Sequence, residues 1–205
     1  MIVATGKRPR PLNVSGEDTF KNKGLTYCAT CDGPLFKDKP VAVIGGGNSA
    51  LDATLQMMRL CPQVYMINIA PQLQGDTVMI DTVQAASNVK IWHKTQVKKI
   101  YGDIFVQGIE VEKENKLYRL AVEGIFVEIG LIPETGFAGA LGRNGAGEIM
   151  VDCYNQTNQA GVFAAGDVTN VPEKQIIIAC GEGSKASLAA FRYLSTHQFN
   201  TQEES

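Results

Sequence analysis

The sequence predicts an α/β protein with a parallel sheet covered on both faces. The apolar run Val41–Ile44 is typical of a strand that is buried on both sides. Three glycines follow it, then a helical pattern over residues 49–60 and a second apolar run over residues 64–69. A strand, turn, helix and strand in this order indicate a right-handed parallel crossover.

The stretch after this unit changes to alternating apolar and polar residues. Residues 104–111 and 117–122 alternate and flank a polar turn at Glu114 and Asn115, which predicts an antiparallel hairpin or meander. Residues 124–130 are expected to form a further strand.

The two ends of the chain carry shorter signals. Residues 1–6 and 161–166 are apolar segments that end in glycine, and each predicts a short buried strand. Residues 7–22 are rich in proline, glycine and charge, which predicts a loop and linker. A helix is expected to run through residues 184–193, and the polar tail, residues 200–205, is expected to be frayed.

The composition is that of a soluble protein with one large or two small domains. The chain has 205 residues, of which 44% are hydrophobic and 20% charged, with a net charge of −2. No basic run is longer than Lys98-Lys99, so nucleic acid is not an expected partner. The apolar runs are shorter than the ~20 residues that a membrane span requires, and no leader precedes residue 1, so the sequence predicts a cytoplasmic protein.

Five cysteines, two of them in the motif YCATCDGP (residues 27–34), raise three alternatives. Cys28 and Cys31 could form a redox pair, bind a metal ion, or be ordinary loop residues. An odd number of cysteines without a leader argues against a structural disulfide framework. Zinc usually takes four ligands, and the isolated His93 and His197 do not supply a second pair, so no metal site is predicted. Packing roles are expected for the other cysteines, which are Cys61, Cys153 and Cys180.

The glycine turn predicts dinucleotide binding. Gly45, Gly47 and Ala50 fit the pattern G-x-G-x-x-G/A between a strand and a helix. The first glycine makes the tight turn, the second lets the backbone approach a pyrophosphate, and the small third residue lets helix and strand pack closely. The helix N-terminus then faces the anion. The alternative is a tight turn without a ligand.

The position that reads the adenosine ribose lies about 20 residues further on. Asn68 occupies this position, and no arginine pair follows it. An amide can bond a hydroxyl but cannot neutralise a 2′-phosphate. The sequence therefore favours NADH over NADPH, while Gln72 and Asp76 are expected to be solvated surface residues.

Four segments together resemble the low-molecular-weight thioredoxin reductase family. They are ATG (residues 4–6), CATCDG (28–33), GGGNSA (45–50) and FAAGD (163–167). Within that family, three stretches look most like the flavoprotein components of alkyl hydroperoxide reductases: GPLFKDKPVAVIGGGNS (33–49), NIAP (68–71) and EKQIIIACGEGSKASLAAF (173–191). The resemblance extends over essentially the whole chain.

This resemblance implies a Rossmann-like NAD(P)H-binding domain, residues 14–122, inserted in an incomplete FAD-binding domain of the same α/β class. Residues 1–13 and 123–205 would be the FAD-domain segments. The implied cofactors are NADH or NADPH, and FAD. The nucleotide would contact Gly45, Gly47, Asn48, Ser49, Ala50 and Asn68. The flavin would contact Gly166, Asp167, Lys174, Gln175 and Ile176, with Asp167 on the ribityl chain and residues 174–176 along the pyrimidine edge. Thr5, Gly6 and Gly130 are further expected cofactor-binding residues that are not assigned to one of the two cofactors.

The resemblance also implies that Cys28 and Cys31 form a redox-active disulfide. Reduced flavin would pass electrons to Cys31, and Cys28 would attack the disulfide of a thioredoxin-like or peroxiredoxin protein. Asp32 would act as the acid or base beside the flavin. A homodimer is implied as well, and the disulfide is expected to form even without flavin, because it depends only on the local spacer.

One part of the family pattern is not found. The only dinucleotide fingerprint in a strand–turn–helix setting is the one assigned to the nicotinamide, since Gly181-Glu-Gly183 follows a helix-like run. We therefore expect the N-terminal part of the FAD domain to be missing. Two further alternatives stay open: a flavin-free nucleotide-binding module without turnover, and an assembly module whose uncovered sheet edge recruits a partner.

Overall fold

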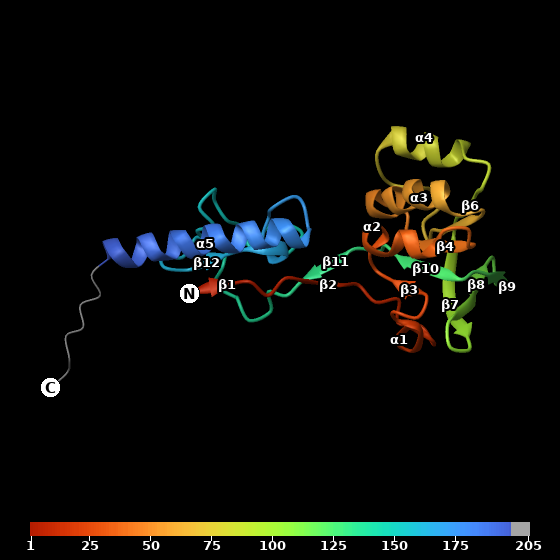
Figure 1. Cartoon of the computed structure of the whole chain (residues 1–205), viewed down its shortest axis with the longest axis horizontal. Coiled ribbons are helices and arrows are strands. Elements are labelled where there is room, and N and C mark those ends of the chain that lie inside the picture. The colour runs from red at the N-terminus through yellow and green to blue at the C-terminus, as the bar shows by residue number, and fades with distance from the viewer. Residues whose placement is uncertain (198–205) are drawn as a thin grey trace. The chain divides into compact units, whose positions relative to one another are not determined.

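A computed structural model describes residues 1–197, which divide into two compact units (Figure 1). Residues 9–130 form the first, here called the insert unit. The second, the flanking unit, consists of residues 1–8 together with the chain from residue 131 onward. The predicted frayed tail lies outside the described residues.

The insert unit is built on a five-stranded parallel sheet. Its order is β3-β10-β4-β5-β6, and the strands are β3 (Leu25–Thr26), β10 (Gly124–Val127), β4 (Val41–Ile44), β5 (Val64–Ile67) and β6 (Val89–Trp92). β4 is the central strand, which confirms the predicted crossover and the predicted parallel arrangement.

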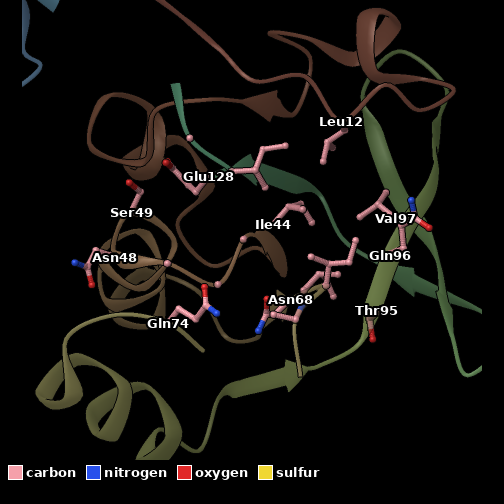
Figure 2. Close-up of a pocket in the computed structure, with 18 residues that line it drawn as sticks. Leu12, Ile44, Asn48, Ser49, Asn68, Gln74, Thr95, Gln96, Val97 and Glu128 are labelled. Carbon is pink, nitrogen blue, oxygen red and sulfur yellow. Dashed lines mark hydrogen bonds between the residues drawn. The ribbon is translucent and has the colours of Figure 1, made fainter. Parts of the chain in front are cut away.

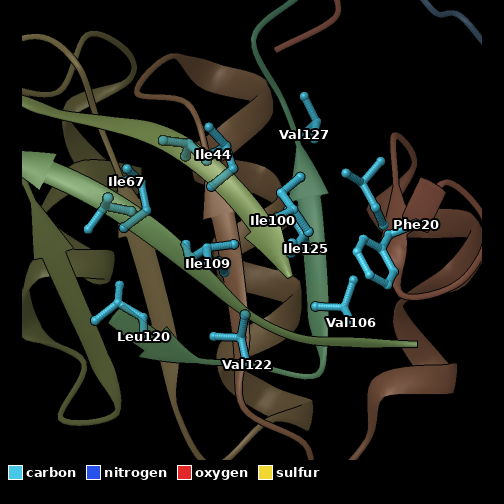
Figure 3. Close-up of a cluster of buried hydrophobic side chains, with 14 residues drawn as sticks. Phe20, Ile44, Ile67, Ile100, Val106, Ile109, Leu120, Val122, Ile125 and Val127 are labelled. Atoms are coloured by element: carbon cyan, nitrogen blue, oxygen red, sulfur yellow. The ribbon is translucent and has the colours of Figure 1, made fainter. Parts of the chain in front are cut away.

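Both faces of this sheet are covered. Val41 and Val43 point to the face that carries α3 (Asn48–Leu60) and α4 (Thr77–Ala85). Ala42 and Ile44 point to the opposite face, where the antiparallel meander packs. Because successive side chains of a strand alternate between faces, the continuous apolar run of β4 supplies both cores. Figure 3 shows the second core, in which β-strand residues of the sheet and the meander interdigitate.

The meander is three-stranded and confirms the alternating pattern. Its strands are β7 (Thr95–Gly102), β8 (Val106–Lys113) and β9 (Lys116–Ala121), in sequential antiparallel order. Glu114 and Asn115 form the predicted turn with φ of 51° and 61°, the backbone that a tight hairpin turn requires.

The bounds of the insert unit differ from the expected residues 14–122. β10 lies between β3 and β4, and Ile125 and Phe126 are completely buried on its two faces. Removing β10 would open the sheet, so the unit extends to Gly130. At the other end it begins at Pro9, and the expected linker contains a short helix, α1 (Glu17–Phe20), which buries Phe20 in the core shared with the meander.

The flanking unit has very short strands and one long helix. β1 (Ile2–Val3) pairs in parallel with β12 (Phe163–Ala164), and β2 (Lys7–Pro9) pairs with β11 (Leu131–Pro133). A 3₁₀ turn, η2 (Gly166–Val168), precedes α5 (Ile176–Thr196). This helix is longer at both ends than the expected residues 184–193.

Helix α5 exposes much of its apolar surface. Of its 21 residues only Ala186 and Ala189 are buried, whereas Ile176 and Ile177 are 83% and 79% exposed. None of the helices within residues 1–197 combines the length and the hydropathy of a transmembrane segment.

The isolated cysteines divide into two kinds. Cys61 is buried at the end of α3, and its thiol donates to the Phe36 carbonyl at 3.3 Å, as a packing role requires. Cys153 and Cys180 are exposed, so the packing role expected for them is wrong. Cys180 lies in an apolar run, but that run is on an uncovered helix face.

Candidate functional site

The first glycine of the fingerprint, Gly45, is required by the fold, whether or not a ligand is bound. Gly45 has φ +144°, and a Cβ built on it would lie 2.3 Å from the Glu128 carbonyl oxygen and 2.8 Å from the Ala50 Cβ. Only glycine tolerates both this backbone and this contact. The tight turn at Gly45 and the close helix–strand packing at Ala50 are thus present as the fingerprint predicts.

The second glycine faces open space. A Cβ built on Gly47 would meet only the Gln74 carbonyl oxygen, at an ordinary 3.6 Å, and its φ of −99° is accessible to any residue. No side chain caps the helix that starts after Gly47, so the first N–H groups of the 13-residue α3 have no side-chain acceptor. These groups and the space before them fit the pyrophosphate of a dinucleotide.

A cavity of about 570 Å³ lies in front of this turn (Figure 2). It opens at the carboxyl ends of β4, β5 and β10, the edge at which open parallel sheets bind ligands, and its volume is in the range of cofactor pockets. It is lined by Leu12, Ile44, Gly45, Gly46, Gly47, Asn48, Ser49, Ile67, Asn68, Ile69, Ala70, Gln74, Thr95, Gln96, Val97, Glu128, Ile129 and Gly130.

Five of the six predicted nucleotide residues, together with the predicted cofactor-binding residue Gly130, therefore line one cavity. The exception is Ala50, which is buried behind the turn. The lining contains no lysine or arginine among the described residues.

Asn68 is directed into its own loop. Its Nδ2 donates to the Gln72 carbonyl at 2.8 Å, and its Oδ1 accepts from the Ala70 N–H at 3.1 Å. The side chain is almost fully buried, and its Oδ1 would lie 2.3 Å from a Cβ built on Gly46. Asn68 thus holds the loop after β5 against the glycine turn.

Asn48 makes a similar connection to the next helix. Its Oδ1 accepts from the Asp76 N–H at 2.9 Å. Asp76 in turn caps α4 by accepting from the Val78 N–H at 2.9 Å. The sequence predicts only a solvated surface residue at Asp76; it is exposed, but it also caps a helix.

Glu128 is the residue of this site that the sequence patterns did not single out. It follows Val127 at the carboxyl end of β10 and lines the cavity. Burial raises the pKa of its carboxyl group to about 7; a hydrogen bond from the Ala29 backbone opposes this shift, and the charge of Asp52 adds to it. An acidic residue directly after a fully buried strand was the available signal.

Cys28 and Cys31 form a disulfide at the start of a short helix in the insert unit. Cys28 is the N-cap of α2 (Ala29–Asp32), and its Sγ accepts from the Cys31 N–H at 3.1 Å. The Cα atoms are 5.3 Å apart, within the usual span of a disulfide. The disulfide alternative for the Cys-x-x-Cys motif is therefore confirmed, and no cluster able to hold a metal occurs in residues 1–197. Cys28 is half-buried and Cys31 is exposed.

Asp32 closes helix α2 beside the disulfide. Its carboxylate accepts a hydrogen bond from the Thr26 hydroxyl at the end of β3. Helix α2 continues into a 3₁₀ turn, η1 (Gly33–Phe36). This turn packs closely on α3, because a Cβ built on Gly33 would lie 2.4 Å from the Met57 Cε. The disulfide segment is thus fixed to the helix of the dinucleotide site.

The residues expected to contact flavin, and the further cofactor-binding residues Thr5 and Gly6, all lie in the flanking unit. The Thr5 hydroxyl donates to the Glu134 carbonyl at 2.7 Å. Gly166, with φ +73°, leaves 3.4 Å between a built Cβ and the Ala179 Cβ of α5. The others are Gly6 with φ +69°, Asp167 in η2, Gln175 as the N-cap of α5 and Ile176 as its first residue.

The Lys174 ammonium is engaged within the flanking unit. Its Nζ donates to the Thr169 carbonyl at 2.6 Å and lies 3.2 Å from the Glu148 carboxylate. Burial alone would raise the pKa of Glu148, but hydrogen bonds from Lys7, Asn144 and Lys174 outweigh it and lower the pKa to about 2.

These features are those of a nucleotide-dependent disulfide oxidoreductase, and the chain belongs to the pyridine nucleotide-disulphide oxidoreductase family, whose pattern matches residues 1–183. The chain is 48% identical over 198 residues to the F subunit of alkyl hydroperoxide reductase from Escherichia coli (strain K12), covering 95% of this chain and 38% of that protein. It is 44% identical over 197 residues to a protein named NADH dehydrogenase of Bacillus subtilis (strain 168), covering 95% of this chain and 39% of that protein.

A solved structure has the same fold. Thioredoxin reductase from Streptococcus pyogenes MGAS5005 matches with a TM-score of 0.87 and 32% identity, over 96% of this chain and 65% of that one. The resemblance to the thioredoxin reductases and alkyl hydroperoxide reductase flavoproteins is therefore confirmed. The chain spans less than two-fifths of the length of these curated relatives and about two-thirds of the solved structure.

Proposed function

We propose that this chain is the nicotinamide-binding and disulfide-carrying part of a flavoprotein disulfide reductase. It would pass electrons from NADH through FAD to the Cys28–Cys31 disulfide and on to a thioredoxin- or peroxiredoxin-type protein. The observation that carries the proposal is that the dinucleotide cavity and the disulfide helix belong to one compact unit and share α3 as a support.

The roles of the chain's own residues follow from thiol chemistry. FAD, when bound, supplies the relay that accepts two electrons from NADH and delivers them to a disulfide. Reduction opens the Cys28–Cys31 bond, with Asp32 as the proton donor and acceptor beside it. The Cys28 thiolate then attacks the partner's disulfide to form a mixed disulfide, which Cys31 resolves, so that the partner leaves as a dithiol.

NADH is the proposed nucleotide. A 2′-phosphate needs a cation to neutralise it, and the described cavity lining supplies none. Asn68 keeps the loop after β5 in place instead. A relative at 44% identity carries the name NADH dehydrogenase, which agrees with this choice.

Flavin binding would involve the flanking unit together with a further length of chain. Thr5, Gly6, Gly166, Asp167, Lys174, Gln175 and Ile176 are the proposed flavin contacts of this chain. The relatives are more than twice as long, and only one dinucleotide fingerprint is present in this sequence. Turnover is therefore proposed for the chain completed by an FAD-binding segment, and a homodimer is proposed for that completed protein.

The test combines nucleotide titration with thiol counting. We expect the purified chain to bind NADH at least about tenfold more tightly than NADPH, since an unpaired phosphate charge is costly to desolvate. Mild oxidation should leave three free thiols in the parent chain. Five free thiols after oxidation would rule out the redox pair.

The matched controls are Cys28→Ser and Cys31→Ser, each of which should leave four thiols that resist intramolecular pairing. An absorbance spectrum tells the alternatives apart. A chain that binds NADH but shows no flavin bands, and gains no NADH-dependent disulfide reduction when an FAD-binding segment is supplied in trans, would be a binding module without turnover.

A further inference from the structure

Glu128 occupies a position between the dinucleotide cavity and the disulfide helix. Its backbone carbonyl is the atom that a side chain on Gly45 would strike, at 2.3 Å. Its own side chain lies on the same face of β10 as Phe126, the face that carries α2 and α3. Figure 2 shows the carboxylate on the same side of the cavity as Ser49, which is in the first turn of α3.

The groups around this carboxylate come from three elements. Helix α2 contributes the Ala29 N–H, which bonds the carboxylate, and α3 contributes the negative charge of Asp52. The glycine turn after β4 contributes only backbone. Asp32, the one carboxylate of α2, is bonded to the Thr26 hydroxyl. The cavity lining holds no lysine or arginine in the part of the chain that is described. Glu128 thus has no cationic partner among these groups.

We propose that Glu128 is a proton-linked determinant of dinucleotide affinity. Its ionised carboxylate repels the diphosphate at the glycine turn and weakens binding, whereas its neutral carboxyl group does not. The inference rests on the proposed function, because it requires that the cavity take a dinucleotide. A diphosphate at Gly45–Gly47 places two negative charges beside a half-buried carboxylate. Binding therefore favours the protonated carboxyl group.

The direction of the pH dependence follows from this linkage. The pKa of free Glu128 is raised to about 7 by burial, and a bound diphosphate raises it further. Affinity for the dinucleotide is then highest below pH 7 and falls as the pH rises through 7, until the bound form is ionised too.

The experiment measures the affinity of the full chain for ADP-ribose, an acid-stable probe that contains the diphosphate, from pH 6.0 to pH 8.5. A pKa shift of about one unit on binding makes the dissociation constant rise roughly five- to tenfold over this range. Glu128→Gln should bind with little pH dependence and retain the tighter value at pH 8.5. Glu114→Gln, which removes an exposed carboxylate on the β8–β9 turn, is the matched control and should follow the parent chain.

A second measurement on the parent chain does not depend on any variant. Calorimetry at pH 7.5 in buffers of different ionisation enthalpy should report uptake of roughly half a proton per ADP-ribose bound. Asp52→Asn should move the pH dependence to lower pH, because it removes a charge that raises the pKa of Glu128.

The outcomes separate the inference from the function on which it rests. A parent chain that binds ADP-ribose with the same affinity at every pH and takes up no proton overturns the role of Glu128 but leaves the dinucleotide site intact. The same holds if Glu128→Gln keeps the parent's pH dependence. Failure of the parent chain to bind ADP-ribose at any pH overturns both.

Discussion

In the insert unit the central strands are buried on both faces, whereas in the flanking unit a helix of 21 residues buries only two side chains. The insert unit contains the complete set of elements that its sheet needs: helices on one face and a meander on the other. The flanking unit has two pairs of strands, none longer than three residues. The insert unit therefore forms its hydrophobic cores from its own elements, whereas the flanking unit leaves apolar side chains of α5 exposed in this chain.

The largest expected contrast is between two isoleucine substitutions. Ile109 is fully buried in β8, whereas Ile177 in α5 is 79% exposed. Ile109→Ala should lower the free energy of unfolding by about 2–4 kcal/mol through lost burial and a cavity. Ile177→Ala should change it by less than about 0.5 kcal/mol.

Two probes follow the units separately in urea. Trp92, the single tryptophan, lies in β6 and reports the insert unit by fluorescence. Far-UV circular dichroism reports the helices of both units, so the part of its change that does not follow Trp92 fluorescence reports α5. A loss of more than about 1 kcal/mol in the Ile177→Ala variant would mean that the exposed face of α5 is covered in solution.

Within the insert unit, the two glycines of the fingerprint should differ in their effect on stability. Gly45→Ala places a Cβ against the Glu128 carbonyl at a φ of +144°, and should cost about 2–4 kcal/mol of stability. Gly47→Ala should change stability by less than about 1 kcal/mol, because its Cβ meets nothing closer than 3.6 Å.

Gly47 should matter for ligand binding although it matters little for stability. Gly47→Ala should weaken NADH and NADPH about equally, by roughly fivefold or more, since the methyl group occupies the approach of the shared pyrophosphate. Isothermal titration at a temperature where both the parent and the variant are folded checks this. If Gly47→Ala bound both nucleotides with unchanged affinity, the pyrophosphate would not bind at this turn.

The two units are also expected to respond to pH in opposite directions. The pKa of Glu148 in the flanking unit is lowered from 4.5 to about 2, so its contribution to stability is present above pH 4.5 and lost as the pH falls towards 2. The pKa of Glu128 in the insert unit is raised from 4.5 to about 7, so the stability of that unit falls as the pH rises from 4.5 to 7.

Urea titrations between pH 3 and pH 8 with the same two probes test these signs. Glu128→Gln should flatten the response of Trp92 fluorescence between pH 4.5 and 7, and Glu148→Gln should flatten the acid response of α5. Parallel pH profiles for the two units in the parent chain would contradict the assignment of these carboxyl groups.

Features that depend on neighbouring residues can be predicted from the sequence. The apolar run of β4, the glycine turn, the start of α3 and the Cys28–Cys31 spacing are all local, because backbone conformation and side-chain direction repeat over two to four residues. These features, with the alternation after residue 104, were enough to predict the α/β class, the parallel crossover and the meander. The spacing alone left three alternatives for the cysteine pair, and the family resemblance implied the disulfide that the structure contains.

Contacts between residues that are distant in the sequence depend on how the whole chain packs. β10 enters the sheet between β3 and β4, about a hundred residues from β3, so no local pattern marks the boundary at Gly130. The amide of Asn68 turns into its own loop, and Glu128 meets the Ala29 N–H, because of how the loops and strands pack around them. Burial sets the pKa of a carboxyl group and the exposure of an apolar helix face, and burial is a property of the whole packing rather than of a sequence window.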